Sequence, residues 1–233
     1  MKTHGEKFYI NMPLFAARLY DNLTNVKGVN KTFEEIANFI AGYLKQGKVL
    51  DVGTGHGRLL LEINKQNQQI DLYGLDVSSS MLELARLHLR EINNIDLRVG
   101  NIIKTEYQDD FFDCIVCSGS FYNWDKPTVG LNEIFRILKS GKTAYLFESK
   151  KDYNRDFLDS RLQENLKDYG FIRKTISKYF LRKQLRMTYS IAEFDEIIKQ
   201  TKFEGSYHIQ EIELGNLPIW LKIELKKITI NDN

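Results

Sequence analysis

The chain has 233 residues, of which 42% are hydrophobic and 27% charged, with a net charge of +2 at pH 7. These values are typical of one α/β domain with room for an inserted cap, and they single out neither nucleic acid nor a membrane as partner. Residues 1–11 lack the apolar run of a signal peptide, and no segment reaches the ~20 apolar residues of a membrane span. Since the chain has only two cysteines, we expect a cytoplasmic protein.

The chain begins with two predicted helices. Residues 12–23 are amphipathic and start at Pro13, a residue favoured in the first turn of a helix. Thr32 and Glu35 then have the spacing of a capping box, which predicts a second helix that ends at Gly47. The side chains of the first helix expected to pack inward are Leu14, Ala17 and Leu19.

A glycine-rich stretch follows the second helix. The apolar run of residues 48–51 ends in Asp51, Gly53, Gly55 and Gly57 alternate after it, and leucines then return at helical spacing. This pattern predicts a buried strand, a turn and a helix, with a cofactor lying against the glycine backbone at the carboxyl end of the strand. A dinucleotide fingerprint would need glycine at position 58, which is Arg58. The acid before the first glycine would repel a pyrophosphate but suits an ammonium group.

The second predicted strand, residues 71–76, also ends in an acid, Asp76. An acid at this position can accept hydrogen bonds from both ribose hydroxyls of an adenosine. Ser80 and Glu83 predict a capping box for the following helix. Residues 95–99 predict a third strand, and Asn101 follows it directly.

Residues 111–118 predict a fourth strand that contains both cysteines. Cys114 and Cys117 have the spacing of a metal or redox pair. Residues three apart in a strand point to opposite faces, however, so the two thiols cannot share one ion. We therefore expect two core residues and no metal site.

Two of these stretches resemble one family, the class I S-adenosylmethionine (SAM) dependent methyltransferases. Residues 51–57 resemble its motif I, and residues 76–86 resemble its signature after the second strand. The resemblance implies SAM as cofactor and S-adenosylhomocysteine (SAH) as product. It also implies that Asn101 stands where the family usually has an acid for the adenine amino group, and that Ile102 presses on the adenine. The cofactor residues that we expect are Tyr20, Asp51, Gly53, Thr54, Gly55, Gly57, Asp76, Val77, Met81, Asn101, Ile102 and Ser118.

Residues 15–21 resemble the amino-terminal lid of many small-molecule methyltransferases, in which a Tyr-Asp pair covers the methionyl end of the cofactor. Tyr20 is therefore a lid candidate, and the alternative is a partly buried helix tyrosine. For the methyl acceptor, the segment after the fourth strand offers polar and aromatic groups, although its rings could equally pack against the next helix. The expected acceptor residues are Phe15, Ser120, Phe121, Tyr122 and Trp124. No spacing announces a catalytic acid or base, and His56 is interpreted as a loop filler.

The rest of the chain predicts a helix over residues 128–138 and a strand over 143–148. Residues 151–189 lie outside the minimal fold and consist of a predicted helix, residues 152–169, and a second stretch. The second stretch, residues 171–189, carries six basic residues and no acid. A solvated basic face is favoured over a contact for RNA or an acidic membrane surface. Ser190 and Glu193 predict a capping box for a last helix that runs to Thr201.

Two final strands, residues 206–214 and 219–228, are joined by only four residues and must form an antiparallel hairpin. The resemblance thus implies a Rossmann-like α/β fold with a seven-stranded, mostly parallel sheet. We divide the chain into a helical lid (1–46), a SAM-binding core (47–150), a cap insertion (151–189) and a closing helix and hairpin (190–233).

The expected function is methyl transfer from SAM to a small or medium-sized acceptor, by a monomer or homodimer. RNA methylation and a non-catalytic SAM-binding scaffold remain as alternatives, and nucleic acid is the less favoured partner. The sequence does not identify the acceptor.

Overall fold

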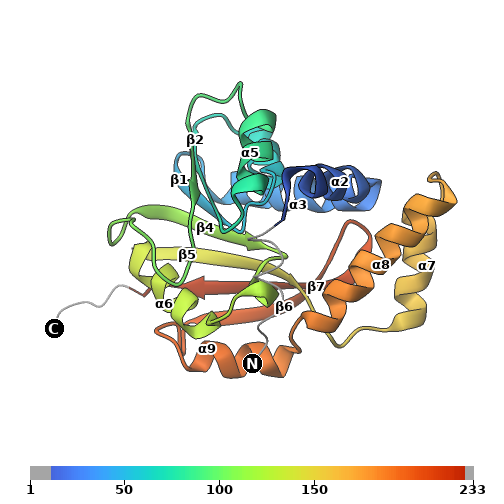
Figure 1. Ribbon diagram of the computed structural model, residues 1–233. Helices are drawn as coiled ribbons and strands as arrows, with labels where there is room; N and C mark the ends of the chain where they lie inside the picture. Colours follow the sequence, from blue (N-terminus) through green and yellow to red (C-terminus); the bar gives the residue numbers. More distant parts are fainter. Residues whose placement is uncertain (1–11, 229–233) are drawn as a thin grey trace.

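The computed structural model describes residues 12–228 and is built on a seven-stranded sheet in the order β3-β2-β1-β4-β5-β7-β6 (Figure 1). Strands β1 to β5 run parallel, and β7 is antiparallel to both of its neighbours. The predicted parallel sheet closed by an antiparallel hairpin is therefore confirmed. The strands are β1 Gly47–Val52, β2 Ile70–Asp76, β3 Ile95–Val99, β4 Phe112–Ser118, β5 Leu138–Ser149, β6 Tyr207–Leu214 and β7 Leu217–Lys226.

Helices cover both faces of this sheet. The apolar sides of α3, α4 and α5 pack on one face, and those of α6 and α9 pack on the other. The central strands β1 and β4 are apolar almost throughout because both of their faces are buried. The helices are α2 Leu14–Thr24, α3 Lys27–Tyr43, α4 Arg58–Gln66, α5 Ser79–His88, α6 Pro127–Ile137, α7 Arg155–Asn165, α8 Phe171–Met187 and α9 Ile191–Lys199, with a short 3-10 turn at Phe121–Asn123.

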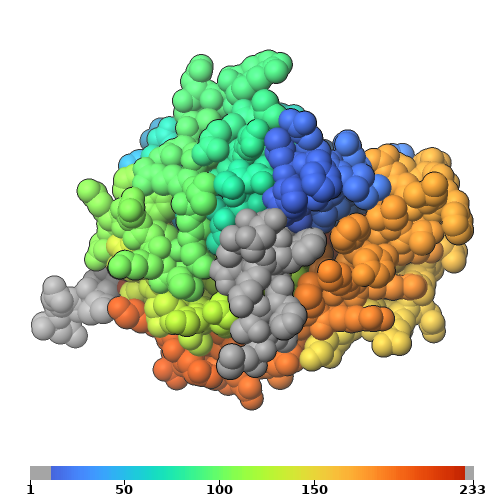
Figure 2. All heavy atoms as spheres, in the orientation of Figure 1, coloured from blue at the N-terminus to red at the C-terminus, as the bar shows by residue number. Residues whose placement is uncertain are grey.

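Helices α7 and α8 stand at one end of the molecule, beyond the tip of the β6–β7 hairpin (Figure 1). Leu158 and Leu162 of α7 and Leu185 of α8 share an apolar cluster with Leu217 and Ile219 of β7. Helix α2 lies between α5 and α8, as Figure 2 shows on one face of the molecule. The amino-terminal helix therefore joins the core to the two additional helices.

One of the three predicted capping boxes is present. Ser190 and Glu193 exchange both hydrogen bonds at the start of α9. The box at Thr32 is wrong: α3 already begins at Lys27, and the Thr32 hydroxyl donates to the carbonyl of Gly28 inside the helix. The box at Ser80 is also wrong, because Ser78 is the residue that caps α5.

Several element boundaries differ from the prediction. Strand β5 begins at Leu138, directly after α6, and α7 covers only part of the helix predicted over residues 152–169. The hairpin turn consists of Gly215 and Asn216 alone, with φ of +58° and +62°, so that Leu217 and Pro218 belong to β7. Leu19 was expected to pack inward but is 56% exposed, because it lies on the solvent side of α2.

The two cysteines are buried in different apolar clusters, Cys114 with that of α3 to α5 and Cys117 with that of α6 and α9. Their predicted placement on opposite faces is confirmed. Within residues 12–228, no group of three His, Cys, Asp or Glu side chains is arranged to hold a metal ion. Nor does any helix in that range have the length and apolar character needed to cross a membrane.

Candidate functional site

The glycine loop after β1 is held tightly on two sides and is open between them. Gly53, Gly55 and Gly57 all have positive φ, at +75°, +56° and +79°. A Cβ at Gly53 would lie 2.3 Å from Ser120 Oγ, and one at Gly57 would lie 2.6 Å from Leu89 Cδ1. A Cβ at Gly55 would have no neighbour within 4 Å. The backbone can therefore approach a ligand closely at Gly55, while the other two glycines permit packing.

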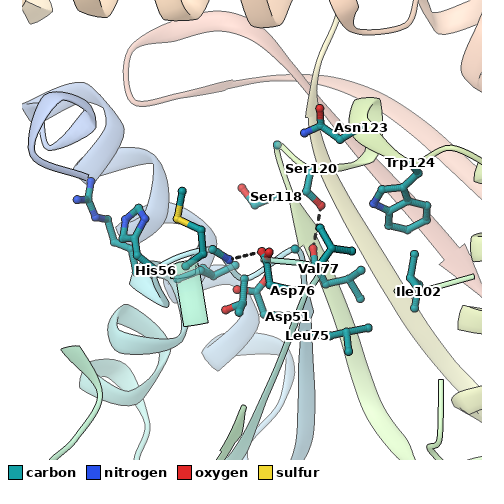
Figure 3. A pocket seen from close by; sticks show the side chains of 18 of the residues that line it. Asp51, His56, Leu75, Asp76, Val77, Ile102, Ser118, Ser120, Asn123 and Trp124 are labelled. Carbon is teal, nitrogen blue, oxygen red and sulfur yellow. Dashed lines mark hydrogen bonds between the residues drawn. The ribbon is translucent and has the colours of Figure 1, made fainter. Parts of the chain in front are cut away.

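A cavity of about 170 Å³ lies over this loop, at the carboxyl ends of β1, β2 and β4 (Figure 3). Eleven of the twelve expected cofactor residues line it, and the exception is Gly57, which caps α4. Ser120, Tyr122 and Trp124 line it as well, together with Phe33, His56 and Arg58, which sequence reasoning had not placed in the site. Residues distant in the chain thus meet at the edge of the sheet where open α/β folds bind ligands.

Asp76 is held in one orientation at this cavity. Its carboxylate accepts hydrogen bonds from the amides of Gly55 and Ser78, both at 2.8 Å. Burial raises its pKa above the usual value, while these amide donors counteract the rise. Since a carboxylate has about four lone-pair sites, it can still accept from two hydroxyls of a ligand. The arrangement fits a ribose.

Asp51 is 2% exposed and borders the same cavity. Burial raises its pKa from 3.8 to about 7, the Thr54 side chain lowers it, and the neighbouring charge of Asp76 raises it further. An ammonium group beside this carboxylate would favour its ionised form and lower its pKa. The observed pair of desolvated acids therefore fits a cationic ligand that also carries hydroxyls.

Apolar side chains form part of the cavity wall beyond the two aspartates. Ile102 and Trp124 line it and lie side by side, since a Cβ at Gly130 would touch both side chains. The Asn101 side-chain carbonyl accepts from the Ile103 amide at 3.1 Å, which holds Asn101 at the cavity edge. An aromatic base can stack on such a wall.

A polar cluster ties α2 to the glycine loop. Arg58 donates to Asp21 at 2.8 Å, and the ring nitrogens of His56 and His88 lie 3.3 and 3.5 Å from the same carboxylate. Burial and the adjacent Arg58 lower the pKa of His56 to about 4, so its ring is neutral at pH 7. The cluster thus holds α2 against the glycine loop, and Tyr20 of the same helix lines the cavity. The spacing of His56 and Arg58 in the loop gave no sign of this partner, which lies more than 30 residues away.

The segment after β4 is positioned by a buried carboxylate. Glu148, at the end of β5, accepts from the amides of Ser120 and Phe121 at 2.9 and 3.0 Å, and Cys117 Sγ donates to the same oxygen at 3.3 Å. Burial raises the pKa of Glu148 to about 7. Ser120 also donates to the carbonyl of Val52 at 2.9 Å, which joins the segment to the glycine loop.

A second, larger cavity of about 500 Å³ adjoins the first. Its walls come from α2, α3, α7, α8 and β7. The residues shared by both cavities mark where they meet, and they are Tyr20, Phe33, His56, Ser118, Gly119 and Tyr122. Two ligands bound side by side would therefore approach each other at this junction.

Two expected acceptor residues lie elsewhere. Phe15 is 74% exposed on the outer side of α2 and lines neither cavity. Phe121 is fully buried and packs against Trp124, Tyr189 and Phe194, which is the packing alternative considered for this segment. Neither side chain lies at a cavity in the structure, because helix orientation and core packing depend on partners distant in the sequence.

Comparison with known proteins points to one family. A demethylmenaquinone methyltransferase of Deinococcus radiodurans is 32% identical over 132 residues, 55% of each chain. The ubiquinone/menaquinone biosynthesis C-methyltransferase UbiE of Geotalea daltonii is 29% identical over 62% of this chain and 63% of that protein. The chain thus spans little more than half the length of these curated relatives.

Solved structures match over nearly the whole chain. A putative SAM-dependent methyltransferase from Methanococcus maripaludis has a TM-score of 0.66 at 22% identity and covers 94% of this chain and 95% of its own. The plantazolicin methyltransferase BpumL, solved with SAH, has a TM-score of 0.71 at 16% identity and covers 98% and 95%. The fold is thus the Rossmann-like fold of class I methyltransferases. Since the model of the family described as "Methyltransferase domain" matches residues 44–229, the chain belongs to that family.

Proposed function

We propose that the protein transfers a methyl group from SAM to a small-molecule acceptor. The observation that carries this proposal is the pair of adjoining cavities, one with the carboxylates of a cofactor site and one large enough for a second molecule. The volume of the second cavity, about 500 Å³, lies within the range of about 300 to 1,000 Å³ that is usual for small-molecule sites. The first cavity would hold SAM and the second the acceptor.

The roles of the cofactor residues follow from their positions. Asp76 would accept from the ribose hydroxyls, Asp51 would face the methionyl ammonium group, and Asn101 with Ile102 would hold the adenine. SAM supplies a methyl group already activated by its sulfonium. The protein therefore has to hold the two molecules in line and exclude water, and such orientation can contribute ~7–11 kcal/mol to lowering the barrier.

The helices around the second cavity would control access. In this proposal residues 1–46 contribute the lid over the core of residues 47–150, with α2 as its covering helix and α3 packed on the sheet. Helices α7 and α8, within residues 151–189, form the cap. Tyr20 of α2 contacts Phe180 of α8 with ring centroids 5.7 Å apart, so lid and cap close the chamber together. Residues 190–233 would complete the sheet.

A binding experiment tests the cofactor half of the proposal. SAM and SAH at a hundredfold excess over their dissociation constants should stabilise the protein by ~2.7 kcal/mol, which is roughly 5–10 °C in melting temperature for this size. Asp76→Ala should weaken binding at least tenfold. Asp71→Ala, at the opposite end of β2, is the matched control and should bind like the wild type. If neither ligand shifts a folded sample, the assignment of the first cavity fails.

Transfer itself is tested with radiolabelled SAM and a panel of acceptors. Label in a small molecule supports the proposal. SAM binding without transfer to any acceptor would favour the scaffold alternative, and label found only in RNA would favour RNA methylation.

A further inference from the structure

The two cavities differ in charge. Asp51 and Asp76 line the first cavity. Among residues 12–228, no aspartate or glutamate lines the second, whose charged or titratable nitrogen groups belong to Lys183 and His56. The nearby carboxylate of Asp21 is turned toward Arg58 and the two histidines. A positively charged ligand is therefore matched by the first cavity and by nothing in the described walls of the second.

The second cavity is also largely apolar. Aliphatic and aromatic side chains face it from each of the surrounding elements, among them Val29, Phe33, Leu162, Leu181, Ile219 and Trp220. The polar groups between them are amides and hydroxyls, such as Gln184, which donates to Ser149 Oγ at 3.4 Å. Such groups orient a ligand by hydrogen bonds but supply no negative charge.

We infer that the second cavity binds a methyl acceptor with an apolar body and no positive charge, which is methylated on an oxygen, carbon or sulfur atom rather than on a protonated amine. This inference rests on the proposed function and narrows its acceptor. A protonated amine would leave water without meeting a carboxylate, and burial of an unpaired charge is strongly unfavourable. An uncharged or acidic acceptor avoids that cost.

The reaction balances without a further reactant. An electron pair of the acceptor atom forms the new bond to the methyl carbon, and the electron pair of the broken C–S bond returns to sulfur. An acceptor atom that carries a proton loses it to water, whereas an ionised carboxylate has none to lose. SAM thereby becomes SAH, and the acceptor gains one methyl group.

Each cavity has its own fluorescent reporter. The chain has two tryptophans, of which Trp124 lines the first cavity and Trp220 the second. Trp124→Phe leaves Trp220 as the single reporter of the acceptor chamber, and Trp220→Phe leaves Trp124 as the reporter of the cofactor site. Circular dichroism of each variant checks that it is folded.

The test uses three ligands of one shape, namely 1-adamantanol, 1-adamantanecarboxylate and 1-adamantylammonium. Each is titrated into Trp124→Phe at pH 7.5 in the presence of SAH. We expect the alcohol and the carboxylate to change Trp220 fluorescence with dissociation constants at least tenfold lower than that of the ammonium. Melting temperatures of the wild-type protein with the same ligands give the same ranking without any substitution.

A variant that adds a negative charge to the second cavity tests whether the missing carboxylate is what excludes cations. Gln184→Glu keeps the side-chain shape and places a carboxylate in the chamber. We expect it to bind the ammonium at least tenfold more tightly than before and the carboxylate more weakly. Ser160→Glu, on the outer side of α7, adds the same charge outside both cavities and should leave the ranking unchanged.

The possible results separate the two proposals. If the ammonium binds the unsubstituted chamber as tightly as the alcohol, or if none of the three ligands perturbs Trp220, the inference is overturned. SAH titrated into Trp220→Phe tests the cofactor site independently. If Trp124 responds to SAH, the proposed function holds even when the inference about the acceptor fails. If a folded sample shows no response to SAH, both the proposed function and the inference about the acceptor fail.

Discussion

Asp51 shows how one residue couples protonation to binding. Its carboxyl group is buried and pairs with no cation among residues 12–228, and burial raises its pKa to about 7. In the unfolded chain the pKa returns to 3.8, so the folded protein without ligand retains a proton that the unfolded chain has lost. This contribution therefore lowers stability as pH rises from about 4 to about 7. A cationic ligand beside Asp51 instead favours the ionised carboxylate, because the two opposite charges attract each other.

We accordingly expect the affinity of the wild-type protein for SAM to fall below pH 7, by up to about tenfold per pH unit. Asp51→Asn should bind SAM more weakly at pH 8 and show a much flatter dependence. Calorimetric titration of both proteins between pH 5.5 and 8.5 checks this, and the ratio of their affinities cancels the titration of the ligand itself. A constant ratio would show that Asp51 does not face the ammonium group.

At the scale of elements, the glycine loop both packs against α5 and leaves room for a ligand, and substitutions at Gly57 and Gly55 can separate these two roles. Gly55 and Gly57 both have positive φ, so alanine at either position is strained to a similar degree. Only at Gly57 would the new Cβ also collide with Leu89 and Ala85 of α5 and its cap.

Gly57→Ala should therefore destabilise the protein more than Gly55→Ala, by about 1–3 kcal/mol of unfolding free energy. Gly55→Ala should instead weaken SAM binding, because its methyl group would occupy the open side of the loop. Chemical denaturation and SAM titration of the two variants give both quantities. Equal destabilisation, with equal loss of affinity, would contradict this division of roles.

The contacts of Asp21 in α2 with Arg58 and His56 of the glycine loop give another prediction. In Asp21→Asn, the guanidinium of Arg58, which is only 12% exposed, loses its carboxylate. We expect a loss of about 1–3 kcal/mol in stability. We also expect faster amide hydrogen exchange in α2.

Glu62→Gln is the matched control for Asp21→Asn. It breaks an i,i+3 pair with Lys65, whose side chain is 54% exposed, and such surface pairs contribute below about 1 kcal/mol. If α2 exchanges equally fast in both variants, the polar cluster does not hold the helix.

The features that could be predicted from the sequence are those that depend on neighbouring residues in the chain. The strand, acid and glycine pattern around Asp51 and Asp76 depends on neighbouring residues, and both the sheet and the position of the first cavity follow from it. Thr32 and Glu35 looked like a cap because their spacing is right, yet Glu35 accepts from the amide of Gly215 at the hairpin. No local pattern contains such a partner. The exposed position of Phe15 and the contact of His56 with Asp21 were missed for the same reason.

At the scale of the molecule, contacts between distant segments enclose the second cavity. The Tyr169 hydroxyl, between α7 and α8, accepts from the amide of Lys27 at 2.9 Å, and Arg173 donates to the carbonyl of Asn22. Arg182 pairs with Asp159 of α7 at 2.8 Å. Two basic residues of α8, Arg173 and Arg182, thus help to hold this helix against α2 and α7.

Because Arg173 and Arg182 are engaged in contacts within the protein, we expect the basic residues of α8 to bind RNA weakly at most. Arg182→Ala should lower the melting temperature slightly, and neither it nor the wild-type protein should bind RNA with a steep dependence on salt. Filter binding of a generic single-stranded RNA between 50 and 200 mM salt provides the measurement. Strong binding by the wild type that is lost in Arg182→Ala would instead support RNA as the acceptor.

The position of β7 has a consequence for synthesis on the ribosome. This strand is the last in the described chain, yet it lies inside the sheet, paired with β5 on one side and β6 on the other. Until residues 217–226 have emerged, β5 is an open edge available for mispairing with other chains. Ribosome-bound chains that end before residue 217 should therefore be protease-sensitive and prone to aggregate, and productive folding should wait for the final hairpin.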